Sequence, residues 1–250
     1  MCGKPTSADL PPRVRQRKRL PQPAIQENGV PRLPVWHSRG YLPHFETPSA
    51  AQHVTFHLAD SLPQTALRRF EAELIILPAE KQDAERRKRI EAWLDAGHGA
   101  CVLRERAMAA LAQCSLLTFD AARYRLLAWV IMPNHVHVLF VPMNDWTVAK
   151  IVASWKKFTA RKICDLRRDR NQPLITPVWH REYWDRYIRD RGHFQRAFQY
   201  IHMNPVKAGL AATPEAWPWS SAHLLGTPIS RLAPVSWRAC PPWRACLAGA

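Results

Sequence analysis

The chain has 250 residues, of which 47% are hydrophobic and 22% are charged, and its formal net charge is +16 at pH 7. This is enough apolar sequence for one sizeable core flanked by tails. It contains no run of 18 uncharged apolar residues and no apolar stretch of the secretory type at its start, so we expect a cytoplasmic protein without a membrane partner. The positive charge favours a polyanion, most simply nucleic acid, although a basic protein with no such partner remains an alternative.

The first 48 residues differ in composition from the rest. They hold nine of the 22 prolines and a basic run from Arg13 to Arg19. Proline at this density disfavours both helices and central strands. We therefore predict a basic arm over residues 1–48, partly disordered, a core domain over residues 49–222 and an irregular tail over residues 223–250.

Hydrophobic periodicity predicts a mixture of strands and helices in the core domain. Strands are predicted over residues 53–59, 124–130, 135–141 and 177–179. Helices are predicted over residues 63–78, 81–95, 101–114, 147–166 and 192–203, the last ended by Asn204-Pro205. Because the strands are few and follow no strict βαβ rhythm, we predict an α+β fold with helices packed on an antiparallel sheet.

Two histidines stand two residues apart in the apolar run from Trp129 to Phe140. On a strand, His135 and His137 project from one face, while Val136 and Val138 enter the core on the other. Two neutral imidazoles on a rigid strand make half of a metal site. Taken alone, however, such a pair is more often a feature of a sheet surface.

The last predicted helix supplies candidates for a third metal ligand and a nucleophile. Tyr200 and Asn204 are four residues apart, so they share one helical face. The Asn204 amide oxygen suits Mg²⁺ or Mn²⁺, and a set of two histidines and one amide leaves positions open for a phosphate oxygen. The phenol of Tyr200 is then placed to attack phosphorus and form a phosphotyrosine that conserves the energy of the broken bond. Tyr183 and Tyr187 have no oxygen ligand one turn away and are weaker candidates.

Other histidine or serine chemistry fits the sequence less well. Nucleotide hydrolases of the histidine-triad type need a third alternate histidine, and Leu139 stands at that position. The sequence has no G-x-S-x-G elbow, no G-x-G-x-x-G motif and no Walker loop.

Several local strings, in order, resemble one family. They are His53–Leu58, Met132–Val138, Ser154–Ala160, Val178–Asp190, Tyr200–Leu210 and Trp217–Ser221. The Pro-Asn-His-x-His and Tyr-x-x-x-Asn-Pro-x-Lys-Ala-Gly strings together are specific. The chain is similar to the REP-associated tyrosine transposases, which belong to the IS200-like single-strand transposases of the HUH superfamily.

This resemblance implies a ferredoxin-like α+β domain with the histidine pair on a central strand. It implies His135, His137 and Asn204 as ligands of Mg²⁺ or Mn²⁺, and Tyr200 as the nucleophile that becomes joined to a DNA 5′ phosphate. The implied partner is single-stranded DNA with palindromic hairpins in a bacterial nucleoid. The chain is expected to be a monomer or a homodimer, with the active site formed within one chain or across two.

The helix over residues 147–166 and the end of the last helix carry candidate DNA contacts. These are Lys156, Lys157, Arg161, Lys162, Lys207 and, as a base-stacking residue, Trp155. A solvated helix face is the alternative for the basic residues. A protein that binds DNA hairpins without cutting them is the alternative function, and the intact set of Tyr200, Asn204 and two histidines argues against it.

Overall fold

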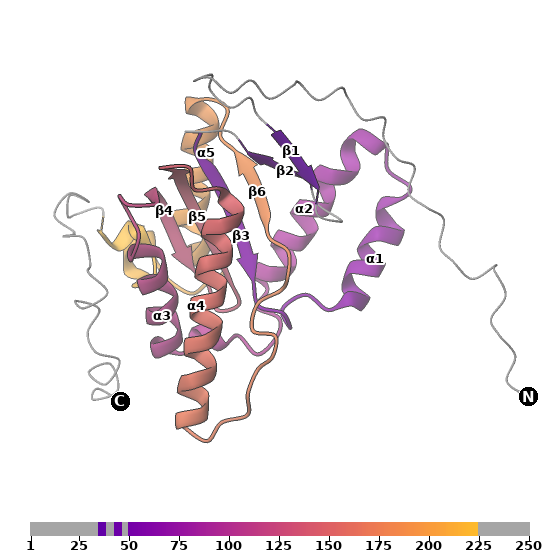
Figure 1. Ribbon diagram of the computed structural model, residues 1–250. Helices are drawn as coiled ribbons and strands as arrows, with labels where there is room; N and C mark the ends of the chain where they lie inside the picture. The colour runs from indigo at the N-terminus through magenta and orange to yellow at the C-terminus, as the bar shows by residue number, and fades with distance from the viewer. Residues whose placement is uncertain (1–34, 39–42, 47–49, 225–250) are drawn as a thin grey trace, which may run out of the picture. The chain divides into compact units, whose positions relative to one another are not determined.

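A computed structural model describes residues 35–38, 43–46 and 50–224 of the chain, all within the second of its two units, residues 32–250. The central element is a four-stranded antiparallel sheet in the order β4-β5-β3-β6 (Figure 1). Its strands are Gln52–His57 (β3), Tyr124–Ile131 (β4), His135–Pro142 (β5) and Trp184–Tyr187 (β6). Helices connect β3 to β4 and β5 to β6, which gives the ferredoxin-like topology and confirms the predicted α+β class.

Five α-helices accompany the sheet in the described part of the chain. They are Gln64–Leu74 (α1), Ala79–Asp95 (α2), Arg106–Leu117 (α3), Val148–Asp169 (α4) and Arg191–Lys207 (α5). Pro78 precedes α2 and separates it from α1, so the single helix predicted over residues 63–78 is shorter than expected. Two side chains cap helices: Thr147 accepts from the Lys150 amide of α4, and Asp190 accepts from the His193 amide of α5.

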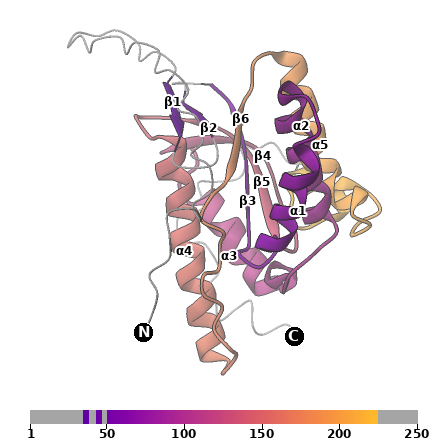
Figure 2. The same ribbon diagram turned by 90° about the vertical axis from the view of Figure 1, so that its right-hand side faces the viewer.

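The two faces of the sheet are covered by different helices (Figure 2). Val136, Val138 and Phe140 of β5 point into the main hydrophobic core, where α3 and α4 pack. On the opposite face, Leu139 packs with Ile201 of α5 in a second cluster. The histidine pair shares that second face, because residues 135, 137 and 139 alternate with the core residues. The main core therefore lies on one face of the sheet, and the buried histidine pair lies on the opposite face.

Besides the shorter α1, the structure differs from the sequence predictions in three places. Within the predicted arm, Val35–Ser38 (β1) and Pro43–Glu46 (β2) form an antiparallel pair, and β2 lies next to β6. Residues 177–179 form only an isolated bridge through Trp179, and the edge strand is β6 instead. Helix α5 continues through Pro205 to Lys207, because a proline this close to the helix end removes only one backbone hydrogen bond.

The other predictions for the ends of the chain lie largely outside the described residues. This holds for residues 1–34 of the predicted arm and residues 225–250 of the predicted tail. Within the described ranges, none of the helices combines the length and the apolar composition that a membrane crossing requires.

Candidate functional site

Strand β5 presents the two histidines side by side, as its alternation predicts. His135 and His137 are each 1% exposed, and their Nε2 atoms lie 3.1 Å apart. Val136 and Val138, between and after them, are fully buried on the other face. A central strand thus directs both imidazoles to the same face of the sheet.

The Nδ1 atom of each histidine is held by a neighbouring polar side chain. Asn134 Oδ1 lies 2.7 Å from Nδ1 of His135, and its amide nitrogen donates to the His98 carbonyl at 3.0 Å. Because a carboxamide oxygen only accepts, Nδ1 of His135 carries the proton and Nε2 presents a lone pair. Thr55 Oγ1 lies 2.8 Å from Nδ1 of His137, as either donor or acceptor. Such outer hydrogen bonds are typical of histidines that bind metals.

Burial keeps both imidazoles neutral. It lowers the pKa of His135 to about 3, and burial together with the neighbouring His135 and His53 lowers the pKa of His137 well below its usual value. Neutral imidazole is the form that binds metal ions. At neutral pH the site therefore offers two nitrogen lone pairs directed at a common point.

Helix α5 brings Tyr200 and Asn204 to the histidines. Asn204 is fully buried, its amide nitrogen lies 3.2 Å from Nε2 of His137, and its Oδ1 has no partner in the described part of the chain. The Tyr200 ring packs edge-on against the His137 ring at 5.3 Å between centroids. The four residues predicted from the sequence as ligands and nucleophile thus meet within one chain.

The Tyr200 hydroxyl lies in a buried and acidic setting. It makes no hydrogen bond of good geometry to a described residue, although Glu91 and Asn204 are close enough to influence it. Burial and the carboxylates of Glu91 and Asp95 raise the pKa of Tyr200. Nζ of Lys207 lies 5.2 Å from the centre of the tyrosine ring.

Asp95, the last residue of α2, completes the cluster and was not predicted from the sequence. Its Oδ1 lies 3.5 Å from Nε2 of His135, and ligand atoms of Asp95, His135 and His137 all fall within 4.8 Å of one another. Burial and the nearby Glu91 raise the pKa of Asp95 to about 6. The available signal was the spacing of Glu91 and Asp95, one turn apart on a helix interpreted only by its apolar residues.

The predicted DNA contacts on α4 lie across the sheet from the histidine pair. Trp155 is 1% exposed and packs against Phe56, Tyr124 and Phe140, so the prediction that it stacks on bases is wrong. Lys156 donates to the Arg181 carbonyl at 2.8 Å, and burial lowers its pKa to about 8. The remaining predicted contacts Lys157, Arg161 and Lys162 belong to the same helix, whereas Lys207 lies beside Tyr200.

Comparisons with known proteins address the family. Residues 102–204 match the family model described as "Transposase IS200 like". A protein of Haemophilus influenzae assigned to the REP-associated tyrosine transposases is 33% identical over 105 residues, and the REP-associated tyrosine transposase of Escherichia coli is 29% identical over 118 residues. The matches cover 40% and 44% of this chain and 60% of each relative, so the chain spans less than two thirds of either.

A solved structure of a REP-associated tyrosine transposase bound to a REP hairpin is 17% identical, with a TM-score of 0.40, and the match covers 80% of this chain and 89% of that one. The family recognised from the short motifs is confirmed by the family model and the two relatives. Residues 102–204 of the chain are thus similar to the IS200-like transposase family.

Proposed function

We propose that the chain cuts and rejoins single-stranded DNA, with Tyr200 as the nucleophile and a divalent metal ion as cofactor. The observation that carries the proposal is the convergence of Tyr200 and Asn204 on the histidine pair within one chain. This convergence was expected from the sequence, and it joins His137 of β5 to Asn204 of α5, 67 residues apart in the chain. A purely structural histidine pair would not require an unpartnered tyrosine hydroxyl beside it.

The donor set fits Mg²⁺ or Mn²⁺. Two Nε2 atoms face one another, and Oδ1 of Asn204 and Oδ1 of Asp95 are both buried without a hydrogen-bond partner among the described residues. Unpartnered buried acceptors are costly unless a ligand satisfies them, and nitrogen with oxygen donors suits these cations. A metal ion held by His135, His137 and Asn204, with Asp95 beside them, supplies Lewis-acid polarisation of the scissile phosphate.

The residues of the chain perform the exchange of bonds. The Tyr200 oxygen forms a bond to phosphorus as the bond from phosphorus to the 3′ oxygen breaks, leaving a 5′ phosphotyrosine and a free 3′ hydroxyl. The phenol proton leaves, and the departing 3′ oxygen gains one. Glu91, beside the Tyr200 hydroxyl, is available as the acceptor, and Lys207 stabilises negative charge on the phenol oxygen. Reversal of the same steps rejoins the strand without an external energy source.

Hairpin-bearing single-stranded DNA is the proposed substrate. The net charge of +16 suits a nucleic acid, and the two curated relatives carry the REP-associated name. A protein that binds such hairpins without cutting has the same charge requirement. The two functions differ only in whether a covalent bond to Tyr200 forms.

The test is a covalent-adduct assay. Purified protein is incubated with labelled single-stranded DNA containing palindromes that flank the gene, in Mn²⁺ or Mg²⁺, and run on a denaturing gel. We expect a shifted protein–DNA band that is lost in Tyr200→Phe and in His137→Ala. Tyr187→Phe, which changes a tyrosine of β6, is the matched control and should retain the band. Tight binding with no adduct in either metal would favour the non-cutting alternative.

A further inference from the structure

We propose that the pocket between α2, β6 and α5 holds a backbone phosphate of the DNA single strand next to the scissile phosphate. This pocket, named here the arginine pocket, has a volume of about 530 Å³, which is typical of ligand sites. The lining residues that matter are His53, Glu91, Arg186, Arg196, Tyr200 and Lys207. The inference rests on the proposed function, because the strand it places is the one that Tyr200 attacks.

Cations dominate the arginine pocket. Arg186, Arg196 and Lys207 line it, and Glu91 is the one acidic residue among its described lining. A second, smaller pocket shares Arg186 and Glu91 and adds Arg87 from α2. Burial, together with proximity to Arg87 and Arg189, lowers the pKa of Arg186. Like charges gathered in this way repel one another, and an anion bound among them relieves that cost.

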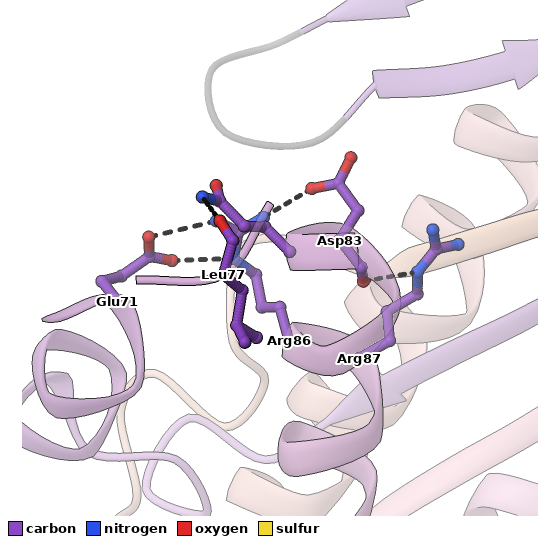
Figure 3. Close-up of polar contacts among 6 residues, drawn as sticks. Glu71, Leu77, Asp83, Arg86 and Arg87 are labelled. Atoms are coloured by element: carbon purple, nitrogen blue, oxygen red, sulfur yellow. Dashed lines mark hydrogen bonds and ion pairs between the residues drawn. The ribbon is translucent and has the colours of Figure 1, made fainter. Parts of the chain in front are cut away.

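These cations are not engaged in ion pairs with the carboxylates that the structure describes, in contrast to their neighbours on α2. Arg86 pairs with Glu71 at 2.9 Å and with Asp83 at 2.7 Å, and both contacts are drawn in Figure 3. Among the residues that the structure describes, Arg87 donates only to the backbone carbonyl of Asp83, at 3.1 Å. One arginine of α2 is therefore committed to α1, whereas the next is available to a ligand on the side of β6.

A second, independent observation is an imidazole without a partner. His53 lines the arginine pocket, and its Nε2 is buried without a hydrogen-bond partner among the described residues. Its ring lies 6.0 Å from the Tyr200 ring and 5.4 Å from the His137 ring, measured between centroids. A neutral imidazole that donates from Nε2 can satisfy a phosphate oxygen at the boundary between pocket and nucleophile.

Continuity with Tyr200 identifies the occupant. Tyr200 lines the arginine pocket and also packs against His137. A DNA strand whose scissile phosphate lies at the histidine pair would therefore place its neighbouring phosphate in the arginine pocket. A strand placed for attack extends into this pocket. The strand path is then on the α2, β6 and α5 side of the sheet, not along α4 as the basic residues of that helix suggested.

The test measures the salt dependence of oligonucleotide binding. Fluorescence anisotropy with labelled oligothymidylate, which needs no recognition sequence, gives Kd between roughly 50 and 200 mM salt for the full chain carrying Tyr200→Phe. Adding Arg186→Gln and Arg196→Gln should reduce the slope of log Kd against log salt by about 0.7, because the one phosphate held in the pocket is no longer neutralised. The control on the other face is Lys157→Gln with Arg161→Gln, which should leave the slope unchanged.

A variant that is expected to bind more tightly provides a test that misfolding cannot mimic, because a misfolded protein would bind less tightly. Glu91→Gln removes the negative charge of the pocket and should tighten oligothymidylate binding by about two- to fivefold. An unchanged slope in the arginine variant, no tightening in Glu91→Gln, or an equal loss in the α4 variant would each overturn the proposal. The adduct assay is a separate measurement, so a failure here leaves Tyr200 chemistry standing, and a missing adduct leaves the pocket to be judged by its slope.

Discussion

Asp95 adds to the proposed metal site a charge that the other proposed ligands lack. His135, His137 and Asn204 are neutral donors, and a carboxylate beside them strengthens the attraction for a divalent cation. Without a metal ion, the negative charges of Asp95 and Glu91 disfavour the negatively charged phenolate form of Tyr200, because they raise its pKa. In the proposed mechanism, metal binding and activation of Tyr200 would therefore be linked through one acidic side chain at the end of α2.

The first prediction follows from that charge. Asp95→Asn keeps the size of the side chain but removes its charge, so Mn²⁺ affinity should fall by about tenfold or more. Titration calorimetry, or the electron paramagnetic resonance signal of free Mn²⁺, measures this without DNA. Asp83→Asn, on the same helix but paired with Arg86, is the control and should bind Mn²⁺ normally. Equal affinity in wild type and Asp95→Asn would remove Asp95 from the metal site.

The second prediction concerns pH and His202. Burial lowers the pKa of His202 to about 4, and Nε2 lies 2.7 Å from the Ser221 hydroxyl. Between pH 6.5 and about 4 the unfolded chain binds a proton that the folded chain does not. The stabilising difference is therefore complete above pH 6.5 and is lost as the pH falls, by up to about 1.4 kcal/mol per pH unit.

His202→Gln removes this titration and keeps a side chain able to reach Ser221. Urea unfolding of the metal-free protein at several pH values should show a shallower loss of stability in the variant than in the wild type. The other buried histidines titrate in both proteins and cancel in the comparison. Parallel stability curves of wild type and variant would show that folding does not lower the pKa of His202.

At the scale of elements, periodicity predicted most of the sheet and its helices. Strands β3, β4 and β5 and helices α2 and α4 lie within a few residues of their predicted ranges, because alternating or helical apolar patterns run through them. Strand β6 was missed because four half-buried or exposed residues at a sheet edge give no such pattern. The end of α5 was misplaced because a proline in the last turn costs little there.

The candidate site divides in the same way. The histidine pair and the pair of Tyr200 and Asn204 were predictable, since each lies on one element with fixed periodicity. Their approach to one another is a tertiary fact that the family resemblance implied. Asp95 and Arg186 were not predicted as site residues, because the sequence alone does not show whether a charged residue on an amphipathic helix or an edge strand points to solvent or to a site.

Helix α4 gives a third prediction, because its apolar face belongs to the core. Trp155 Nε1 donates to the Tyr124 hydroxyl at 2.9 Å, so Trp155→Phe loses a buried hydrogen bond and leaves a void. We expect a decrease of about 1–3 kcal/mol in the free energy of unfolding. Oligonucleotide affinity of the folded variant should be unchanged. A loss of affinity at unchanged stability would restore Trp155 as a DNA-stacking residue, and Phe158→Ala, at a 36% exposed position, controls for the helix surface.

For the whole molecule, the arrangement of Tyr200 with the histidines within one chain has a consequence for mixed oligomers. The fourth prediction is that mixing Tyr200→Phe with His137→Ala does not restore adduct formation, since neither chain contains a complete site. The adduct assay on co-expressed, differently tagged chains checks this. Recovery of a substantial fraction of wild-type adduct would show that tyrosine and metal ligands come from different subunits.

Because side chains alternate along β5, substitutions at odd-numbered and even-numbered positions of this strand should have different effects. Odd positions 135 and 137 belong to the proposed chemistry, and even positions 136, 138 and 140 belong to the main core. In a saturation scan scored separately for abundance and for DNA joining, neighbouring codons should fall into opposite classes. Substitutions that lower abundance would then alternate along a single strand with substitutions that abolish the proposed activity of an abundant protein. Selection on folding and selection on that activity would therefore act on interleaved residues.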